Sequence, residues 1–268
     1  SKVVYEVLQS DTPPEEITFV LPNKRSGLFL KNQLKTALTG NTFLHRIISI
    51  EDLVKEISGF ELLDNVSLLF EFYAVYKTCS PKGKTDRFED FSKWASILLQ
   101  DFNDIDSNLF DADYILDYLN DSKRLEQWNL KDNSRTDLID NYLAFFENIK
   151  TYHKFLWKHL SSKQIGYQGL VYRIASDRLH EYIKDNSREK FIFAGFNALN
   201  KSEEKIIQKL LFLRRADIYW DDDVFYSNSN NQSQQFFKKY RRDWPHYINH
   251  DFKWQTSCIN RKKTIHLY

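Results

Sequence analysis

The chain has 268 residues, with 38 lysines and arginines against 37 aspartates and glutamates, and its formal net charge is +1. This balance excludes a protein that is basic throughout, but it is compatible with a local basic groove. Hydrophobic residues make up 42% of the chain and aromatic residues 16%, which suffices for a packed core and is too apolar for a disordered chain.

Cysteine usage and hydropathy bear on the compartment of the protein. Cys79 and Cys258 are the two cysteines, and they lie far apart without the spacing of a metal site. We therefore expect no disulfide framework and a reducing, cytoplasmic environment. No segment approaches the roughly 18 apolar residues of a membrane span, and no signal peptide is visible, so we expect no membrane partner.

The first predicted elements are two strands, each followed by a helix. The run ITFVLP at 17–22 predicts a strand that ends at a proline, and HRIISI at 45–50 predicts a second strand. Ser49 is expected to cap the helix after the second strand. The helix after the first strand is predicted from regularly spaced leucines, namely Leu28, Leu30, Leu34 and Leu38.

The long middle of the chain, residues 51–184, predicts helices. Apolar residues recur there at three- and four-residue steps, as on one buried helix face, over 87–105, 137–157 and 168–184. The polar stretches between them, 132–137 and 161–166, are typical of loops.

The period changes again near residue 189. KFIFAGF at 190–196 is a continuous apolar run, as expected of a strand buried on both faces of a parallel sheet. Ser202 is expected to cap the next helix, and ADIYWD at 216–221 predicts another strand. A polar loop at 227–234 precedes a short helix rich in aromatic and basic residues.

The order of these elements predicts the fold class. Strand–helix–strand units lie at both ends of the chain, on either side of the helical stretch. We therefore expect one α/β domain with a parallel sheet, formed by residues 1–50 and 185–268. Residues 51–184 are expected to form an all-helical insertion.

Candidate sites for nucleotide chemistry are incomplete in this sequence. No GxxxxGK[ST] phosphate loop is present. Ala194 and Gly195 stand at a strand tip where Mg²⁺-assisted phosphoryl transfer requires carboxylates. Asp221–Asp223 and the acids of DFNDID at 101–106 are interpreted as solvated ends and polar faces of their elements. We expect no metal, no cofactor and no catalytic residue in this chain, and lone histidines such as His153 are expected to be structural.

Two basic stretches are candidates for contact with nucleic acid. The loop PNKRSG places Asn23, Lys24 and Arg25 before a helix, where backbone N–H groups and cations favour a phosphate. The second stretch, FFKKYRRDW, interleaves rings with cations, a composition that suits single-stranded nucleic acid. Its cations are Lys238, Lys239, Arg241 and Arg242. An amphipathic helix with buried rings and solvated cations is the favoured interpretation of this second stretch.

Several segments resemble the superfamily-1 helicases. FVLPNKRSGLFLKNQL resembles motif Ia, a strand followed by Thr-Asn-Lys-Ala-Ala and a helix. FIFAGFNALNKSEEKIIQKLL resembles the motif II strand and helix, and ADIYWDDDVFY resembles the strand before motif III. The resemblance implies a P-loop-NTPase-like parallel sheet, the 1A subdomain, with the helical stretch in the place of subdomain 1B.

The chain is more closely similar to the amino-terminal region of AddB/RecB-type proteins of the PD-(D/E)XK nuclease family. PNKRSGLFLK, FEDFSKWASILLQDFNDID and FAGFNAL carry this resemblance. In the helicase pattern, Ala194 replaces the metal-binding Asp and Gly195 the catalytic Glu. Asp221 ends the strand before motif III, and Val224 falls near the motif III Gln. The resemblance therefore implies a domain that keeps the helicase fold but does not hydrolyse ATP.

Three functions remain open from the sequence. The first is a non-hydrolysing DNA-binding and partner-docking scaffold in DNA-end processing for repair and recombination. Its partners would be single-stranded DNA or duplex ends and a subunit of a helicase–nuclease complex. The second is an active nucleotide hydrolase whose phosphate loop lies outside this sequence. The third is a protein-interaction module with no DNA contact. The full-length protein could be a DNA exonuclease, but the nuclease of this family lies beyond these residues.

Overall fold

The computed structural model describes residues 2–10, 12–37, 45–80, 85–128, 137–220, 222–223, 234–252 and 255–256. The chain divides into two compact units, which we call the sheet unit (1–54 and 179–268) and the helical unit (55–178). Both divisions fall inside helices, α3 (Ile50–Ser58) and α8 (Gln168–Asp185). The boundaries expected after residues 50 and 184 fall inside the same two helices.

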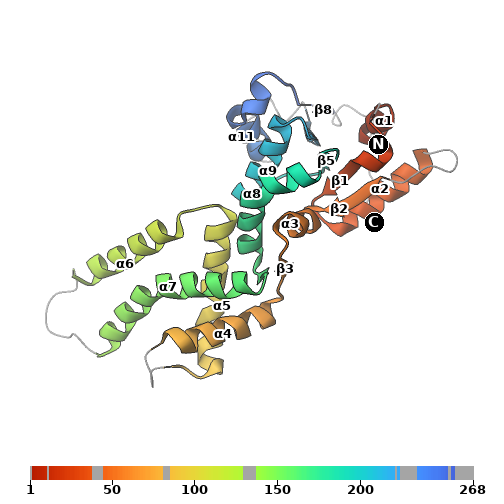
Figure 1. Cartoon of the computed structure of the whole chain (residues 1–268). Helices are drawn as coiled ribbons and strands as arrows, with labels where there is room; N and C mark the ends of the chain where they lie inside the picture. Colours follow the sequence, from red (N-terminus) through yellow and green to blue (C-terminus); the bar gives the residue numbers. More distant parts are fainter. Residues whose placement is uncertain are drawn as a thin grey trace, which may run out of the picture. The chain divides into compact units, whose positions relative to one another are not determined.

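The sheet unit is built on four parallel strands in the order β2-β1-β5-β6 (Figure 1). Their bounds are Ile17–Leu21 for β1, Arg46–Ser49 for β2, Lys190–Ala194 for β5 and Ala216–Tyr219 for β6. All five residues of β1 are buried, as expected of a strand covered on both faces. The prediction of an α/β fold with a parallel sheet is confirmed.

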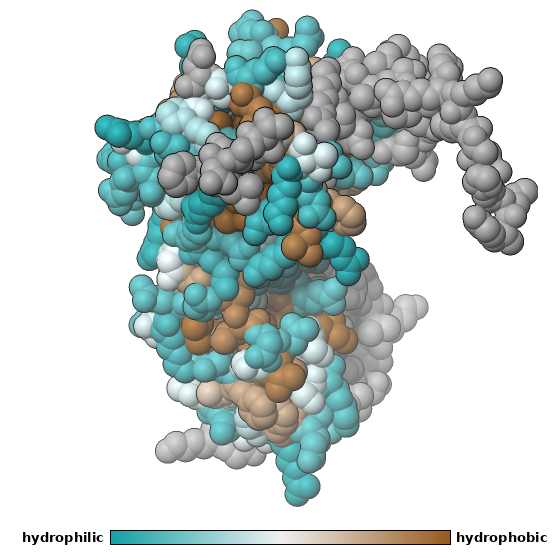
Figure 2. All heavy atoms as spheres, turned by 90° about the vertical axis from the view of Figure 1, so that its right-hand side faces the viewer, coloured by the Kyte–Doolittle hydropathy of each residue, from teal (hydrophilic) through white to brown (hydrophobic). Residues whose placement is uncertain are grey.

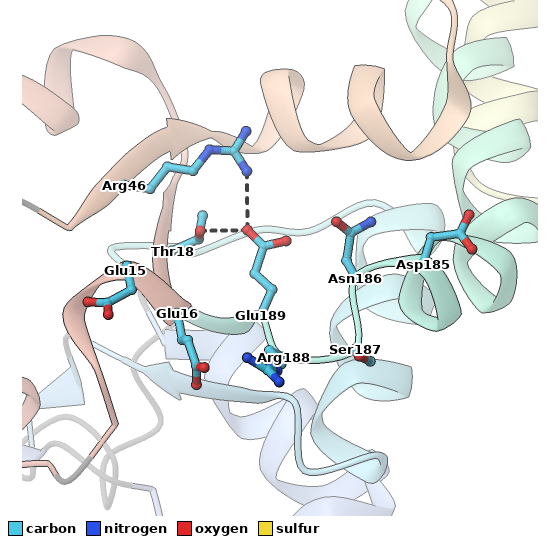
Figure 3. Close-up of a pocket in the computed structure, with 9 residues that line it drawn as sticks. All are labelled: Glu15, Glu16, Thr18, Arg46, Asp185, Asn186, Ser187, Arg188 and Glu189. Carbon is cyan, nitrogen blue, oxygen red and sulfur yellow. Dashed lines mark hydrogen bonds and ion pairs between the residues drawn. The ribbon is translucent and has the colours of Figure 1, made fainter.

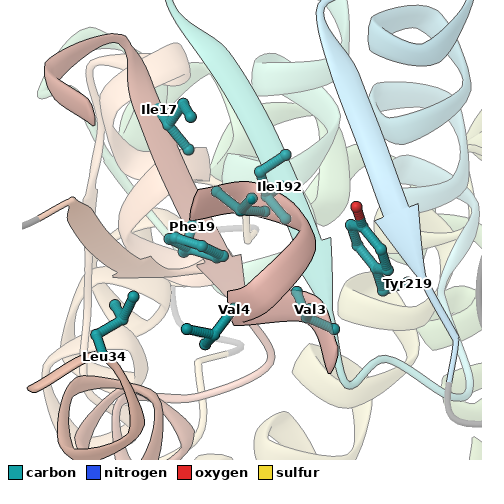
Figure 4. Close-up of a cluster of buried hydrophobic side chains, with 8 residues drawn as sticks. Val3, Val4, Ile17, Phe19, Leu34, Ile192 and Tyr219 are labelled. Carbon is teal, nitrogen blue, oxygen red and sulfur yellow. The ribbon is translucent and has the colours of Figure 1, made fainter. Parts of the chain in front are cut away.

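The remaining elements of the sheet unit are helices and one short pair of strands. They are α1 (Lys2–Leu8), η1 (Pro14–Glu16), α2 (Lys24–Ala37), α9 (Lys201–Phe212), α11 (Gln235–Asp243), η3 (Pro245–Ile248), β7 (Asp222–Asp223) and β8 (Gln255–Thr256). The sequence reasoning did not predict α1. Its Val3, Val4 and Val7 pack on side chains that alternate strand residues send to one face of the sheet, including Phe19 and Ile192 (Figure 4).

An aromatic cluster closes the sheet unit beside β6. Trp220 is fully buried, and its ring contacts Phe237, Tyr240 and Trp244 at centroid distances of 5.2–5.8 Å. Its indole N–H donates a hydrogen bond to the Tyr247 hydroxyl over 2.6 Å. The prediction that the aromatic-basic helix buries its rings is thereby confirmed.

The helical unit contains four helices of its own within the described residues. They are α4 (Asn65–Cys79), α5 (Phe88–Ser107), α6 (Ala112–Trp128) and α7 (Asp137–Ser162). An aromatic core joins α4, α5 and α7, with Phe72 in edge-to-face contact with Phe91, Trp94 and Tyr152. Hydrophobic side chains also reach the surface of this unit, and they are visible as brown patches in the lower half of Figure 2.

The expectation that the insertion is all-helical is wrong in one detail. Residues 161–166, predicted as a loop, contain strand β4 (Ile165–Gly166), which pairs in parallel with β3 (Glu61–Leu62). Two-residue strands of this kind are too short to show a period in the sequence.

The expected cap of α9 is also wrong. Asn200 caps this helix, because its side chain accepts a hydrogen bond from the Glu203 N–H over 2.8 Å. The Glu203 carboxylate in turn accepts from the Asn200 N–H over 3.0 Å, which completes a capping box. Ser202 lies inside the helix and is buried. By contrast, the predicted cap of α3 is confirmed, since the Ser49 hydroxyl accepts from the Asp52 N–H over 3.2 Å.

The acidic stretch 101–106 does not lie wholly on the polar face of α5, as the sequence interpretation had it. Asp106 is 1% exposed, and its Oδ1 lies 2.9 Å from Nε of Arg173 on α8. This contact is an ion pair without the alignment of a hydrogen bond. The other carboxylate oxygen of Asp106 contacts Nε2 of His153 over 3.2 Å and accepts a hydrogen bond from the Tyr167 hydroxyl. Burial, followed by this contact, raises the pKa of Tyr167 well above its usual value.

Candidate functional site

The carboxyl edge of the parallel sheet gathers three loops from distant parts of the chain. The register pairs Leu21 with Ser49, and it pairs Val20 with Phe193. The loops that leave β1, β2 and β5 therefore begin side by side at one edge. This edge is where ligands bind in open parallel α/β sheets, and it is therefore the candidate site of this chain.

The first loop holds two of the predicted DNA-contacting residues in defined positions. Asn23 caps α2, because its Oδ1 accepts hydrogen bonds from the Ser26 N–H over 2.9 Å and from the Ser26 hydroxyl over 3.1 Å. Lys24 Nζ lies 3.2 Å from Oδ1 of Asp52, although the lysine side chain is 76% exposed. The side-chain oxygen of Asn23 is thus already used as a cap, whereas the ammonium of Lys24 still faces water.

Asp52 couples the first loop to the start of α3. Burial raises the pKa of the Asp52 carboxyl. Hydrogen bonds from the Ser49 hydroxyl and N–H, followed by the contact with Lys24, lower this pKa by more than burial raises it. The pKa of Asp52 therefore lies below its usual value. Two helices begin beside each other at this edge, and their free N–H groups add positive potential to it.

The exposed face of α2 is more basic and more apolar than the sequence reasoning recognised. Arg25, Lys31 and Lys35 are exposed and have no ion-pair partner within the described parts of the chain. Leu28 is 64% exposed and Phe29 is 69% exposed.

The leucines whose spacing predicted α2 do not share one buried face of the helix. Within the helix only Leu34 is buried, and Leu30, one turn earlier, is half-buried. Leu28 points away from both, since six residues turn a helix by about 240°. Leu38 lies outside the described residues.

The basic character of the α2 face could have been found in the sequence, because residues 17–50 contain no aspartate or glutamate.

Ala194 and Gly195, which replace the two carboxylates of the helicase pattern, lie in surroundings that suit small residues. The half-buried Ala194 packs against the apolar cluster beneath α1. Gly195 has φ +78°, a left-handed conformation that costs other residues roughly 1–2 kcal/mol. A Cβ at Gly195 would meet only Pro22 Cδ, at 3.9 Å, so the obstacle to a glutamate there is the backbone conformation.

The predicted positions after β6 add no residue to the candidate site. Asp221 and Val224 lie outside the described residues. Asp222 and Asp223 form β7 and pair with β8, beyond the end of β6 at Tyr219. The strand predicted over 216–221 is therefore shorter than expected.

Three of the four predicted DNA-contacting cations of α11 already contact other side chains of the sheet unit. Lys239 lies 3.6 Å from the buried Glu204, and Arg242 forms an ion pair with its neighbour Asp243 over 2.6 Å. Arg241 lies over the ring of Phe252 at 5.6 Å. Lys238 is half-buried. The buried rings of this helix are not available to stack on bases in this conformation.

A polar pocket of about 460 Å³ lies at the opposite, amino-terminal edge of the sheet (Figure 3). Its central residue is Glu189, which accepts hydrogen bonds from the Thr18 hydroxyl over 2.6 Å and from Arg46 over 3.1 Å. The Tyr182 hydroxyl donates to the same carboxylate over 3.2 Å. These contacts join β1, β2 and α8, so we interpret this carboxylate as a structural anchor.

Comparison with known proteins leaves the resemblance untested. No family model matches the chain, and no curated protein matches it. In the described parts of the chain, no group of three or more histidine, cysteine, aspartate or glutamate side chains could hold a metal ion. Among the same residues, no helix has the length and apolar character needed to cross a membrane.

Proposed function

We propose that this chain is a non-hydrolysing, helicase-like domain that binds DNA through the phosphate backbone. It would serve as a scaffold in a helicase–nuclease complex that processes DNA ends, as the resemblance to AddB/RecB-type proteins implies. The observation that carries the proposal is the exposed, acid-free face of α2, a helix that begins at the carboxyl edge of the sheet.

The loss of the motor is supported by local structure as well as by sequence. Phosphoryl transfer depends on carboxylates that hold Mg²⁺ and orient water. The methyl group of Ala194 packs in an apolar cluster, and Gly195 adopts a left-handed conformation. Neither position is prepared to hold a carboxylate, so we expect no ATP hydrolysis by these residues.

The cations of α2 are suited to a polyanion that lies along the helix. Arg25 is the second residue of α2 and lies in its first turn, where the free N–H groups of the helix also favour phosphate. Lys31 and Lys35 extend the positive charge toward the other end of the helix. Each phosphate that such a cation neutralises releases a counterion, so binding should weaken steeply as salt rises.

The test is fluorescence anisotropy with a labelled oligonucleotide over a salt series, with and without ATP and Mg²⁺. Arg25→Glu should lower DNA affinity about tenfold and reduce the salt slope by about one to two phosphates. Lys158→Glu, an exposed charge reversal on α7, is the matched control and should leave affinity unchanged. An ATP effect, or equal affinity for the two variants, would refute the proposal.

A protein-interaction module without DNA contact is the second candidate, and the exposure of Leu28 and Phe29 favours it. Aromatic residues and arginine are enriched where protein surfaces meet, and this face carries Phe29 and Arg25. Absence of DNA binding at low salt, together with capture of a subunit that Phe29→Ala abolishes, would favour this function over the first.

A further inference from the structure

Two exposed helix faces of this near-neutral chain carry opposite charge. The first is the α2 face, formed by Arg25, Leu28, Phe29, Lys31 and Lys35 in the sheet unit. It contains three cations and two large apolar side chains. Nothing in this face is acidic, and its three cations have no ion-pair partner within the residues that the structure describes.

The second face lies on α6 in the helical unit and is acidic and aromatic. Asp113, Asp117 and Asp121 recur every four residues and are exposed. Tyr114 and Tyr118 lie beside them, 70% and 67% exposed. Together with these tyrosines, the three aspartates form what we call the α6 face.

Like charges four residues apart destabilise a helix, so the aspartates of α6 oppose its folding. Lys150 of α7 offsets part of this repulsion. Its Nζ lies 2.7 Å from Asp117 Oδ2 and 3.3 Å from Asp113 Oδ1. Both carboxylates remain about 60% exposed in their side chains, so they can accept further cations from outside.

The two faces match in spacing as well as in charge. Residues four apart on a helix lie about 6 Å apart along the axis. Lys31 and Lys35 therefore have the separation of Asp117 and Asp121. On both helices the charged stripe is flanked by exposed rings or aliphatic groups, which can bury one another while the charges pair.

We propose that the α2 face of one copy of this chain docks on the α6 face of a second copy. Lys31 and Lys35 pair with the aspartate stripe, and Leu28 and Phe29 pack on the tyrosine rings. Arg25 adds a guanidinium that stacks on a tyrosine. The near-zero net charge of the chain allows two copies to approach without overall repulsion.

This contact is head-to-tail, since it joins different surfaces of the two copies. After the first contact one copy still has an unused α6 face and the other an unused α2 face, so association continues to larger assemblies or closes into a ring. The proposal does not rest on DNA binding. If DNA binds the α2 face, however, the oligonucleotide and the second copy compete for it.

Sedimentation velocity of the whole chain at several concentrations tests the proposal. At about 50 mM salt we expect assembly that grows with concentration, and at about 500 mM salt we expect it to weaken at least about tenfold, because surface charges are then screened. Lys184→Glu, an exposed reversal on α8, is the control and should assemble as the unchanged chain does.

Charge exchange separates this contact from unspecific aggregation. Lys31→Glu with Lys35→Glu should abolish assembly, and so should Asp117→Lys with Asp121→Lys. A chain that carries all four changes should assemble again, because each α2–α6 contact then pairs the reversed charges. Failure of the fourfold variant to recover would overturn the proposal. So would a chain that stays monomeric at low salt and high concentration.

Discussion

Replacement of the buried Asp106 by asparagine should destabilise the helical unit strongly. Asp106 is 1% exposed and makes an ion pair with Arg173 as well as contacts with His153 and Tyr167. Removing one partner of a buried ion pair costs about 3–5 kcal/mol, because the other charge is left uncompensated. Asparagine keeps the volume and one acceptor for Tyr167, which returns about 1 kcal/mol.

Arg173 also reduces the loss, since one of its terminal nitrogens still donates to the Ile105 carbonyl over 3.2 Å and its side chain is 24% exposed. We therefore expect Asp106→Asn to lower the free energy of unfolding by about 2–3 kcal/mol. Urea denaturation followed by circular dichroism measures this change, and hydrogen exchange of α5 and α8 assigns it to the helical unit.

Asp104→Asn is the matched control for this experiment. Asp104 lies two residues before Asp106 on the same helix but is exposed. Its replacement should change the free energy of unfolding by no more than about 0.5 kcal/mol. Equal unfolding midpoints for Asp106→Asn and Asp104→Asn would show that the buried ion pair contributes nothing, and the reasoning would be wrong.

Two further predictions concern the same unit. Gly169→Ala should destabilise it by about 1–3 kcal/mol, because a Cβ there would lie 2.2 Å from the Asn103 carbonyl oxygen, and an unchanged unfolding midpoint would contradict this close approach. The hydrogen bond from Lys163, partly offset by burial and supported by His159, lowers the pKa of Glu71. Its contribution to stability is therefore fully present above the unfolded pKa of about 4.5 and is lost as pH falls through the lower folded value. Glu71→Gln should remove this part of the acid dependence in urea unfolding measured between about pH 3 and 5, and an identical pH profile for both proteins would refute it.

The sequence predicted the strands of the sheet well because their signals are local. Continuous apolar runs locate β1 and β5, and a serine followed by acids locates the start of α3. The lengths of the strands were less accurate, since β6 ends at Tyr219 and the predicted strand continued to 221. Strand ends depend on which backbone groups find partners, and the apolar pattern does not contain that information.

The residues that needed tertiary context were the ones predicted wrongly. A leucine-rich helix offers several faces, and which one is buried depends on what packs against it, so the leucine spacing that predicted α2 did not reveal that Leu28 is exposed. Asp106 was assigned to a solvated face although it lies one turn after the buried Phe102. The sequence shows that Asp106 lies on the same helix face as Phe102. Its partners could not be found there, because Arg173 lies in the distant helix α8 and Tyr167 lies just before that helix.

The central pair of strands in the sheet has a consequence for how the chain folds. The contact between Thr18 of β1 and Glu189, next to β5, joins residues 171 positions apart. Closing so long a loop is slow and entropically costly, whereas the helical unit is one contiguous segment with many local contacts. During synthesis the helical unit can therefore fold before β5 has left the ribosome. Until then β1 can pair only with β2, and the side of β1 that pairs with β5 in the folded sheet stays open.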